Sequence, residues 1–214
     1  TIKAQDEVID ITGYNYDSVS VDSIRLETDS SKNVITIYYT KKADLSYTVN
    51  YYEEGTVQKV AESKVVDKQI FNATVKEEAI DVPGYAVVDP ATQSIVIAVE
   101  GNVINFYYTR RVDLGYVVNY LEKDTDKKVI PSKNVTGQTY LSDVTEQAMP
   151  VEGYDMVEPT SNTITIGVSE NVINFYYTKR TNLSYTVNYL EKGATEPLAP
   201  AKVVDGQTFE TKIT

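Results

Sequence analysis

Asparagine and tyrosine side chains recur at a fixed spacing that would let them bind a sugar. The set repeats after 69 residues, and its members are Asn50, Asn105 and Tyr107, then Asn119, Asn174 and Tyr176. An aromatic ring can stack on a sugar ring, and flanking amides can hydrogen-bond to its hydroxyl groups. A second interpretation is that these residues are cross-strand pairs on a solvated sheet face, with no ligand. If they do bind, their repetition makes the contacts multivalent, so that weak single contacts gain by avidity.

Other residue types give no catalytic constellation. The chain has no Cys and no His, which removes thiolate nucleophiles, imidazole bases and the common zinc sites. The carboxylate pairs Glu53-Glu54 and Glu77-Glu78 are neighbours in sequence, whereas a glycosidase needs two carboxylates facing across a cleft. We therefore expect a protein that is not an enzyme, with no catalytic residues, no cofactor and no metal.

Two further kinds of chemistry stay open at this stage. The acidic loops Asp124-Thr125-Asp126 and Asp29-Ser30-Ser31 offer oxygen ligands for Ca²⁺, but neither has the ligand count of a defined calcium loop, which favours solvated turns. Lys lies near Asn and Asp around the strands of every copy, so an intramolecular isopeptide bond is an alternative that nothing in the spacing demands.

Charge and hydropathy exclude two classes of partner. The formal net charge is -11, so phosphate backbones and anionic lipid surfaces would repel the chain as a whole. No stretch approaches the roughly 18 consecutive apolar residues of a membrane span. We expect no nucleic-acid binding and no membrane insertion.

An internal repeat organises the whole sequence. Tyr47, Tyr116 and Tyr185 are spaced 69 residues apart, and about half of the aligned positions of the two complete copies are identical. The predicted divisions are a leading half-repeat (1–44, matching the second half of a copy), a first complete repeat (45–113), a second complete repeat (114–182) and a trailing half-repeat (183–214, matching the first half of a copy).

Alternating β-branched and aromatic residues predict five strands in the first complete repeat. The first two span Leu45–Glu53 and Lys59–Asp67 and form a hairpin. A third strand spans Tyr85–Val88. Ser94–Val99 then pairs with Asn102–Thr109 through a turn at residues 100–102. These strands form a mixed sheet.

One short helix is predicted between the second and third strands. Thr74 with Glu77, and Asp143 with Glu146 in the next copy, have the spacing of a capping box, and the helix ends before Pro83. A single helix covering one face of a mixed sheet makes the fold class α+β.

Alternation also separates a core face from a solvent face. In the last strand Ile104, Phe106 and Tyr108 share the predicted core face, which Val49 and Tyr51 of the first strand join. The matching core residues of the other copies are Ile35, Ile37 and Tyr39, then Ile173, Phe175 and Tyr177. Asn50, Asn105 and Tyr107 then point outward.

Several segments in a constant order identify a family. They are the YTVNYLEK-like segment that opens each copy, the Lys-x-Val-x-x-Gln step at Lys64–Gln69, Lys133–Gln138 and Lys202–Gln207, the Gly-Tyr pair after the predicted helix, and the closing NVINFYYT. With these segments the chain resembles the MucBP (mucin-binding protein) repeat family over essentially its whole length.

The resemblance implies a fold, a location and a partner. It implies tandem ubiquitin-like β-grasp domains in a cell-wall-attached surface protein of Gram-positive bacteria, secreted and engaged in adhesion to mucin or another host glycoprotein. No signal peptide, sorting motif or anchor is present in the sequence, so we expect a fragment of a longer exported protein.

Three functions compete. The first is an adhesin array that binds mucin or host glycans by weak multivalent contacts, and the second is a structural stalk that displays another domain. Only seven residues, Thr109–Gly115, separate Tyr108 from Tyr116, which favours an elongated rod in either case. The third is head-to-tail self-association, in which the two terminal half-repeats complete one another between chains.

Overall fold

The computed structural model describes residues 1–213 and divides into two compact units, Thr1–Arg110 and a second that begins at Arg111. Two short 3-10 turns occur, η1 at Ala4–Glu7 and η2 at Ser30–Lys32. All other regular elements of the described residues are β-strands. The expected α+β class is therefore wrong, and the fold is a repeated β fold.

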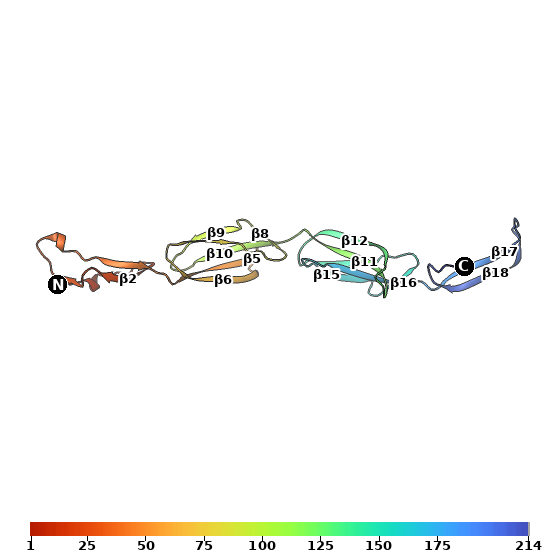
Figure 1. The fold of residues 1–214 in the computed structure, drawn as a ribbon, viewed down its shortest axis with the longest axis horizontal. Helices are drawn as coiled ribbons and strands as arrows, with labels where there is room; N and C mark the ends of the chain where they lie inside the picture. Colours follow the sequence, from red (N-terminus) through yellow and green to blue (C-terminus); the bar gives the residue numbers. More distant parts are fainter. Residues whose placement is uncertain (214) are drawn as a thin grey trace. The chain divides into compact units, whose positions relative to one another are not determined.

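The first unit contains one four-stranded and three two-stranded sheets. Its strands are β1 Ile2–Lys3, β2 Tyr14–Val19, β3 Ser23–Ile24, β4 Ile37–Lys41, β5 Leu45–Glu53, β6 Lys59–Gln69, β7 Thr74–Glu78, β8 Tyr85–Val87, β9 Thr92–Val96 and β10 Val103–Arg110 (Figure 1). The four-stranded sheet has the order β6-β5-β10-β8, in which the central β5 and β10 run parallel and the outer pairs are antiparallel. The two-stranded sheets are β1-β3, β2-β4 and β7-β9.

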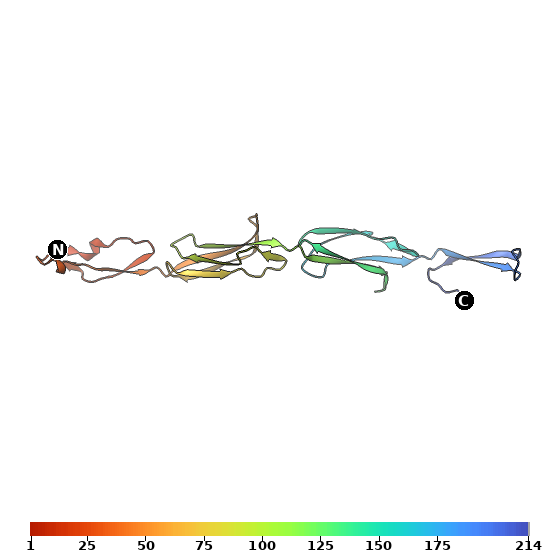
Figure 2. The same ribbon diagram turned by 90° about the horizontal axis from the view of Figure 1, so that it is seen from above.

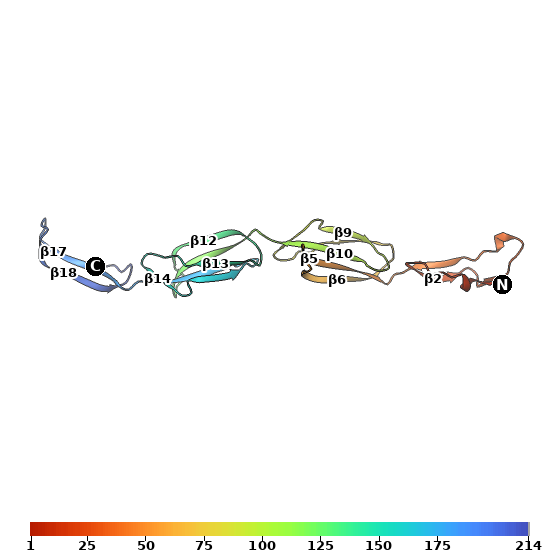
Figure 3. The ribbon, with the colours of Figure 1, turned by 180° about the vertical axis from the view of Figure 1, so that it is seen from behind.

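In the second unit the four-stranded sheet has the same order and strand directions as in the first. Its strands are β11 Leu114–Glu122, β12 Lys128–Gln138, β13 Asp143–Gln147, β14 Tyr154–Val157, β15 Ser161–Thr165, β16 Val172–Lys179, β17 Leu183–Leu190 and β18 Pro197–Gln207 (Figure 3). The sheets are β12-β11-β16-β14, β13-β15 and β17-β18. The antiparallel β17 and β18, blue in Figure 2, run side by side in the trailing half-repeat.

The core of each complete repeat lies between its four-stranded and two-stranded sheets. Val49, Tyr51, Ile104, Phe106 and Tyr108 are at most 2% exposed, and Val75 of β7 and Ile95 of β9 pack against them. The predicted core residues of the second repeat, Ile173, Phe175 and Tyr177, are equally buried. In the leading half-repeat Ile35, Ile37 and Tyr39 are half-buried, where β4 belongs to a sheet of two strands only.

The predicted helix is a strand. Thr74–Glu78 forms β7, which pairs antiparallel with β9, and Asp143–Gln147 forms β13 in the same way. Burial along β7 alternates with a period of two, so Val75 and Glu77 point inward. Glu77 does not cap a helix, because its carboxylate accepts hydrogen bonds from Tyr47 and Lys64.

The expected hairpin between Ser94–Val99 and Asn102–Thr109 is also wrong. β9 ends at Val96 and pairs with β7, and a loop leads from it to β10. The side chain of Asn102 fixes that loop: its Oδ1 accepts from Ala98 N at 2.8 Å, and its Nδ2 donates to Ala98 O at 2.8 Å and to Ser46 O at 3.0 Å. Asn171 makes the same three bonds in the second repeat, with Gly167 and Gly115.

Among the described residues, none of the helices has the length and apolar character that crossing a membrane would require.

Candidate functional site

The predicted asparagines meet on the outer face, the side of the four-stranded sheet turned away from the core. Asn50 on β5 lies directly opposite Asn105 on the parallel β10, and its Nδ2 donates to Asn105 Oδ1 at 3.0 Å. Ser63 of β6 donates to Asn50 Oδ1 at 2.7 Å, and Lys59 donates in turn to Ser63 at 2.7 Å. A polar chain thus crosses three strands and fixes the amides in position.

The second complete repeat carries the same polar chain. Asn119 Nδ2 donates to Asn174 Oδ1 at 2.9 Å, and Ser132 donates to Asn119 Oδ1 at 2.7 Å. Within residues 1–213 the Nδ2 groups of Asn105 and Asn174 have no hydrogen-bond partner. Each outer face therefore keeps one Nδ2 group whose N–H donors are available to solvent or a ligand.

The predicted tyrosines lie on the same face, two residues further along the strand. Tyr107 and Tyr176 are both 41% exposed. Tyr107 is opposite Tyr52, with ring centroids 6.3 Å apart and an interplanar angle of 32°. Tyr176 is opposite Leu121, so the neighbour of the exposed ring differs between the two repeats.

A groove that the sequence did not predict lies beside Tyr176. Leu121, Tyr176 and Val157 form a row across three neighbouring strands, and the loop of residues 123–126 forms the wall of an open groove of about 460 Å³. The sequence indicates Tyr176 and the acidic loop as separate candidates. Their closeness depends on the strand register, which the sequence did not predict.

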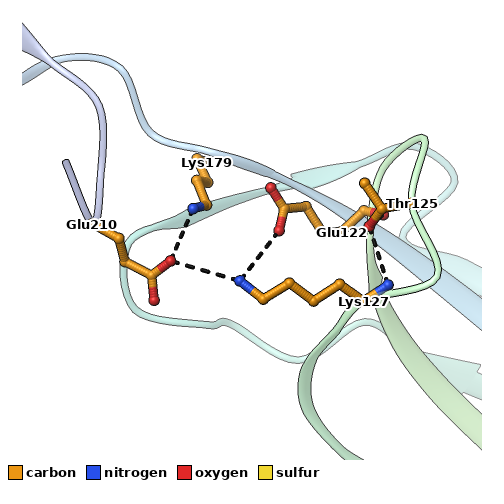
Figure 4. Close-up of polar contacts among 5 residues, drawn as sticks. All are labelled: Glu122, Thr125, Lys127, Lys179 and Glu210. Carbon is orange, nitrogen blue, oxygen red and sulfur yellow. Dashed lines mark hydrogen bonds and ion pairs between the residues drawn. The ribbon is translucent and has the colours of Figure 1, made fainter.

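The loop that walls this groove is held by its own turn and by ion pairs (Figure 4). Thr125 Oγ1 donates to Glu122 O at 3.0 Å and accepts from Lys127 N at 3.1 Å. Lys127 Nζ lies 3.6 Å from Glu122 and 3.7 Å from Glu210, which also accepts from Lys179 Nζ at 2.9 Å. The pairing with Lys179, and secondarily Lys127, holds the pKa of the Glu210 carboxyl below its usual range.

Neither calcium nor an isopeptide bond gains support from the geometry. No group of three or more acidic residues that could hold a metal ion occurs within residues 1–213. Lys64 and Lys133 form ion pairs with two mostly buried glutamates, Glu77 at 2.7 Å and Glu146 at 2.6 Å.

These glutamates also accept hydrogen bonds from core tyrosines. Hydrogen bonds from Lys64 and then Tyr47 hold the pKa of Glu77 below its usual range, and the bond to Glu77 raises the pKa of Tyr47 to about 12. Glu146 with Tyr116 repeats both shifts.

An aromatic ring rests on a glycine where consecutive repeats join inside each unit. Phe71 covers Gly13 and contacts Tyr14 edge-on, with centroids 5.7 Å apart. Phe209 covers Gly153 and contacts Tyr154 in the same way at 5.5 Å. Both glycines have positive φ, +83° and +78°, and a Cβ at either would overlap the ring.

These features define a tandem β-sheet repeat with an ordered amide and tyrosine face. No family model matches the chain. By sequence it is 28% identical over 182 residues to Internalin J of Listeria monocytogenes serotype 4b (strain F2365), covering 79% of this chain and 19% of that protein. The chain thus spans about a fifth of the length of this relative.

Solved structures of bacterial repeats are also similar to the chain. The type 2 repeat of the mucus binding protein MUB from Lactobacillus reuteri aligns at 11% identity with a TM-score of 0.24, covering 63% of this chain and 99% of that one. SHIRT domains 3-4 of a streptococcal cell surface protein align at 10% identity with a TM-score of 0.19, covering 62% and 96%. Mucus-binding repeats are thus among the solved structures to which the chain is similar.

Proposed function

We propose that the chain is an extracellular, cell-wall-attached adhesin array whose repeats bind mucin or other host glycans by weak multivalent contacts. The observation that carries the proposal is the recurrence of one arrangement, an exposed tyrosine two residues beyond a fixed asparagine pair, on the outer face of both complete repeats. The residues proposed to bind are Asn50, Asn105, Tyr107, Asn119, Asn174 and Tyr176. The resemblance to MucBP repeats makes mucin the first ligand to test.

The physical argument is that this face is ordered before any ligand arrives. Because the asparagines are tied to each other and to Ser63 or Ser132, binding costs little side-chain entropy. An exposed ring then offers its apolar face to a pyranose, while the free Nδ2 donor is available to a hydroxyl group. One such contact is weak, and two on one chain gain from their high effective concentration.

The test measures binding of the whole chain to immobilised mucin and to a glycan panel at several ligand densities. Tyr107→Ala and Tyr176→Ala are compared singly and together. At high density we expect the double variant to lose about tenfold or more in apparent affinity and each single variant to lose less. At low density only one repeat of each chain can bind at a time. The difference in apparent affinity between the unsubstituted chain and the single variants should then be smaller.

The matched control shortens an exposed side chain on the same strands and the same face, but leaves the tyrosine rings in place. Val103 and Val172 occupy equivalent exposed outer-face positions on β10 and β16, so Val103→Ala with Val172→Ala should leave mucin binding unchanged. Saturable binding that the tyrosine variants do not affect would exclude the outer face as the site.

A structural stalk with no ligand of its own is the second candidate. It is favoured by the glycine–aromatic joints at Gly13 with Phe71 and Gly153 with Phe209, which would restrict movement between consecutive repeats. A folded chain that binds neither mucin nor any glycan of the panel would favour this function. No contact among the described residues supports head-to-tail self-association, and we leave it out of the proposal.

A further inference from the structure

The two complete repeats present different chemistry at one place on a shared scaffold. A shift of 69 residues places Tyr52, Glu54, Gly55 and Val57 of the first repeat at the positions of Leu121, Lys123, Asp124 and Asp126 of the second. The first repeat therefore has a pair of rings beside a loop whose tip residue, Val57, is 94% exposed. The second has a single ring beside a charged loop.

The loop backbone is the same in both repeats. Thr56 Oγ1 donates to Glu53 O at 3.0 Å and accepts from Gln58 N at 3.0 Å, as Thr125 does with Glu122 and Lys127. Gly55 and Asp124 both have positive φ, +72° and +62°. The two loops therefore differ in side-chain chemistry while keeping one conformation.

The charged loop faces a floor suited to a sugar ring. Leu121, Tyr176 and Val157 form an apolar row under the groove, and Asp124 and Asp126 line its wall. Within residues 1–213 neither carboxylate has a hydrogen-bond or ion-pair partner, so both are free to accept from hydroxyl groups. Hydrogen bonds to a charged acceptor are roughly twice as strong as bonds between neutral groups.

The charge of the groove favours some sugars over others. Two free carboxylates stand against one free ammonium, that of Lys123, because Lys127 is engaged by Glu122 and Glu210. A sialic acid carboxylate or a sulfate would meet this excess of negative charge, in a chain whose net charge is -11. A neutral pyranose meets no such repulsion, and its hydroxyl groups can donate to the two carboxylates.

From these observations, and resting on the proposed glycan-binding function, we infer that the groove beside Tyr176 is a subsite for an uncharged pyranose. Tyr176 stacks on the ring of the sugar, and Asp124 and Asp126 accept its hydroxyl groups. The equivalent face of the first repeat, with the Tyr52 and Tyr107 rings and no loop carboxylate at these positions, lacks this polar half of the subsite. The two repeats are therefore unequal in their ligand preference.

The experiment uses the whole chain with Tyr107→Ala, so that the second repeat reports alone. The probes are glycans with neutral galactose, N-acetylglucosamine or fucose ends, each beside a sialylated or sulfated counterpart. Asp124→Asn with Asp126→Asn keeps the shape of the loop and removes its charge. We expect this double variant to bind a neutral probe about tenfold more weakly. The ratio of its affinities for neutral and sialylated probes should also be smaller than in the chain with both aspartates.

The second variant is a loop exchange, which is suitable because the loop backbone has the same hydrogen bonds and a positive φ at the same position in both repeats. Lys123→Glu, Asp124→Gly and Asp126→Val install the first-repeat residues, and neutral-probe binding should fall to a similar extent while the chain stays folded. The reciprocal exchange, Glu54→Lys, Gly55→Asp and Val57→Asp in a chain carrying Tyr176→Ala, should improve binding of neutral probes by the first repeat.

The outcomes separate this inference from the proposed function. Neutral binding that depends on Tyr176 but is unchanged in the asparagine variant overturns the subsite and leaves the adhesin standing. If the Tyr107→Ala chain prefers sialylated or sulfated probes, the subsite is likewise overturned and the adhesin left standing. Absence of any glycan binding by the folded chain overturns both.

Discussion

The hydroxyl group of Tyr47 donates a hydrogen bond to the Glu77 carboxylate at 2.5 Å, which joins the four-stranded sheet to the two-stranded sheet of the first complete repeat. Tyr116 and Glu146 form the same link at 2.6 Å in the second. Lys64 and Lys133 complete each link from the edge strand of the larger sheet. One polar triad thus ties both layers together in each repeat.

Removing the hydroxyl group of the triad should destabilise the unit that contains it. Tyr47→Phe keeps the buried ring but removes a hydrogen bond to a charged acceptor, a loss of about 1.5–3 kcal/mol. The midpoint of urea unfolding of the first unit should fall, whereas Tyr107→Phe, which removes an exposed hydroxyl group, should leave it unchanged. Equal midpoints in the two variants would contradict a stabilising role for the link.

Stability should decrease in acid because of Glu77 and Glu146. Their folded pKa values lie below the ordinary 4.5, so their contribution is complete above that pH and is lost as the pH falls through the lowered values. Urea midpoints measured from pH 6 downward should show this loss. The double variant Glu77→Gln with Glu146→Gln should make the urea midpoint less dependent on pH in this range. Glu62→Gln, at an exposed position, should not.

Stability should also decrease in alkali, for the opposite reason. The pKa values of Tyr47 and Tyr116 rise from 10.0 to about 12 on folding, so their contribution is complete below pH 10 and is lost as the pH rises toward 12. Burial raises the pKa values of Tyr51, Tyr108, Tyr120 and Tyr177 as well. Tyr47→Phe with Tyr116→Phe should therefore reduce this alkaline loss without abolishing it, which a urea series between pH 9 and 12 would measure.

Asn102 should matter for stability more than any outer-face asparagine. Asn102→Ala removes a side chain that is only 9% exposed, together with its three hydrogen bonds to the backbone groups of Ala98 and Ser46, at a cost of about 2–3 kcal/mol. Asn105→Ala, on the solvated face, should cost less than about 1 kcal/mol. Thermal unfolding of the two variants, measured side by side, tests this order. A larger decrease in stability for Asn105→Ala than for Asn102→Ala would refute it.

A methyl group on Gly153 should loosen the joint between the second complete repeat and the trailing half-repeat. In Gly153→Ala the new Cβ would overlap the Phe209 ring, and the hydrogen bonds from Arg180 N to Gly153 O and from Phe209 N to Arg180 O should open more often. Amide hydrogen exchange at Arg180 and Phe209 should accelerate. Gly137→Ala has similar backbone strain at φ +72° but no atom near its Cβ, so it should leave both amides protected.

The sequence was sufficient for the features that depend on alternation along one strand. The strands at 45–53 and 59–67, the burial of Val49 and Phe106 and the shared face of Asn50 and Asn105 follow from a period of two and from the repeat. These features need no knowledge of which strand lies beside which.

The features that were predicted wrongly or not at all depend on contacts between segments that are distant in sequence. Thr74 and Glu77 have the spacing of a helix cap, and only Tyr47 and Lys64, about thirty and thirteen residues earlier, make Glu77 an inward strand residue. The groove beside Tyr176 needs the register that aligns Leu121 and Val157 with it. Neither contact leaves a signal within a window of local sequence.

The parallel pairing of β5 with β10, and of β11 with β16, has a mechanical consequence. The chain enters each complete repeat through the first strand of the pair and leaves through the second, so tension on the chain pulls the two strands past one another along their length. The hydrogen bonds of the ladder then carry the load together, in shear, and cannot open one after another as in a peeling hairpin. Each complete repeat is thereby suited to resist tension applied between its two ends.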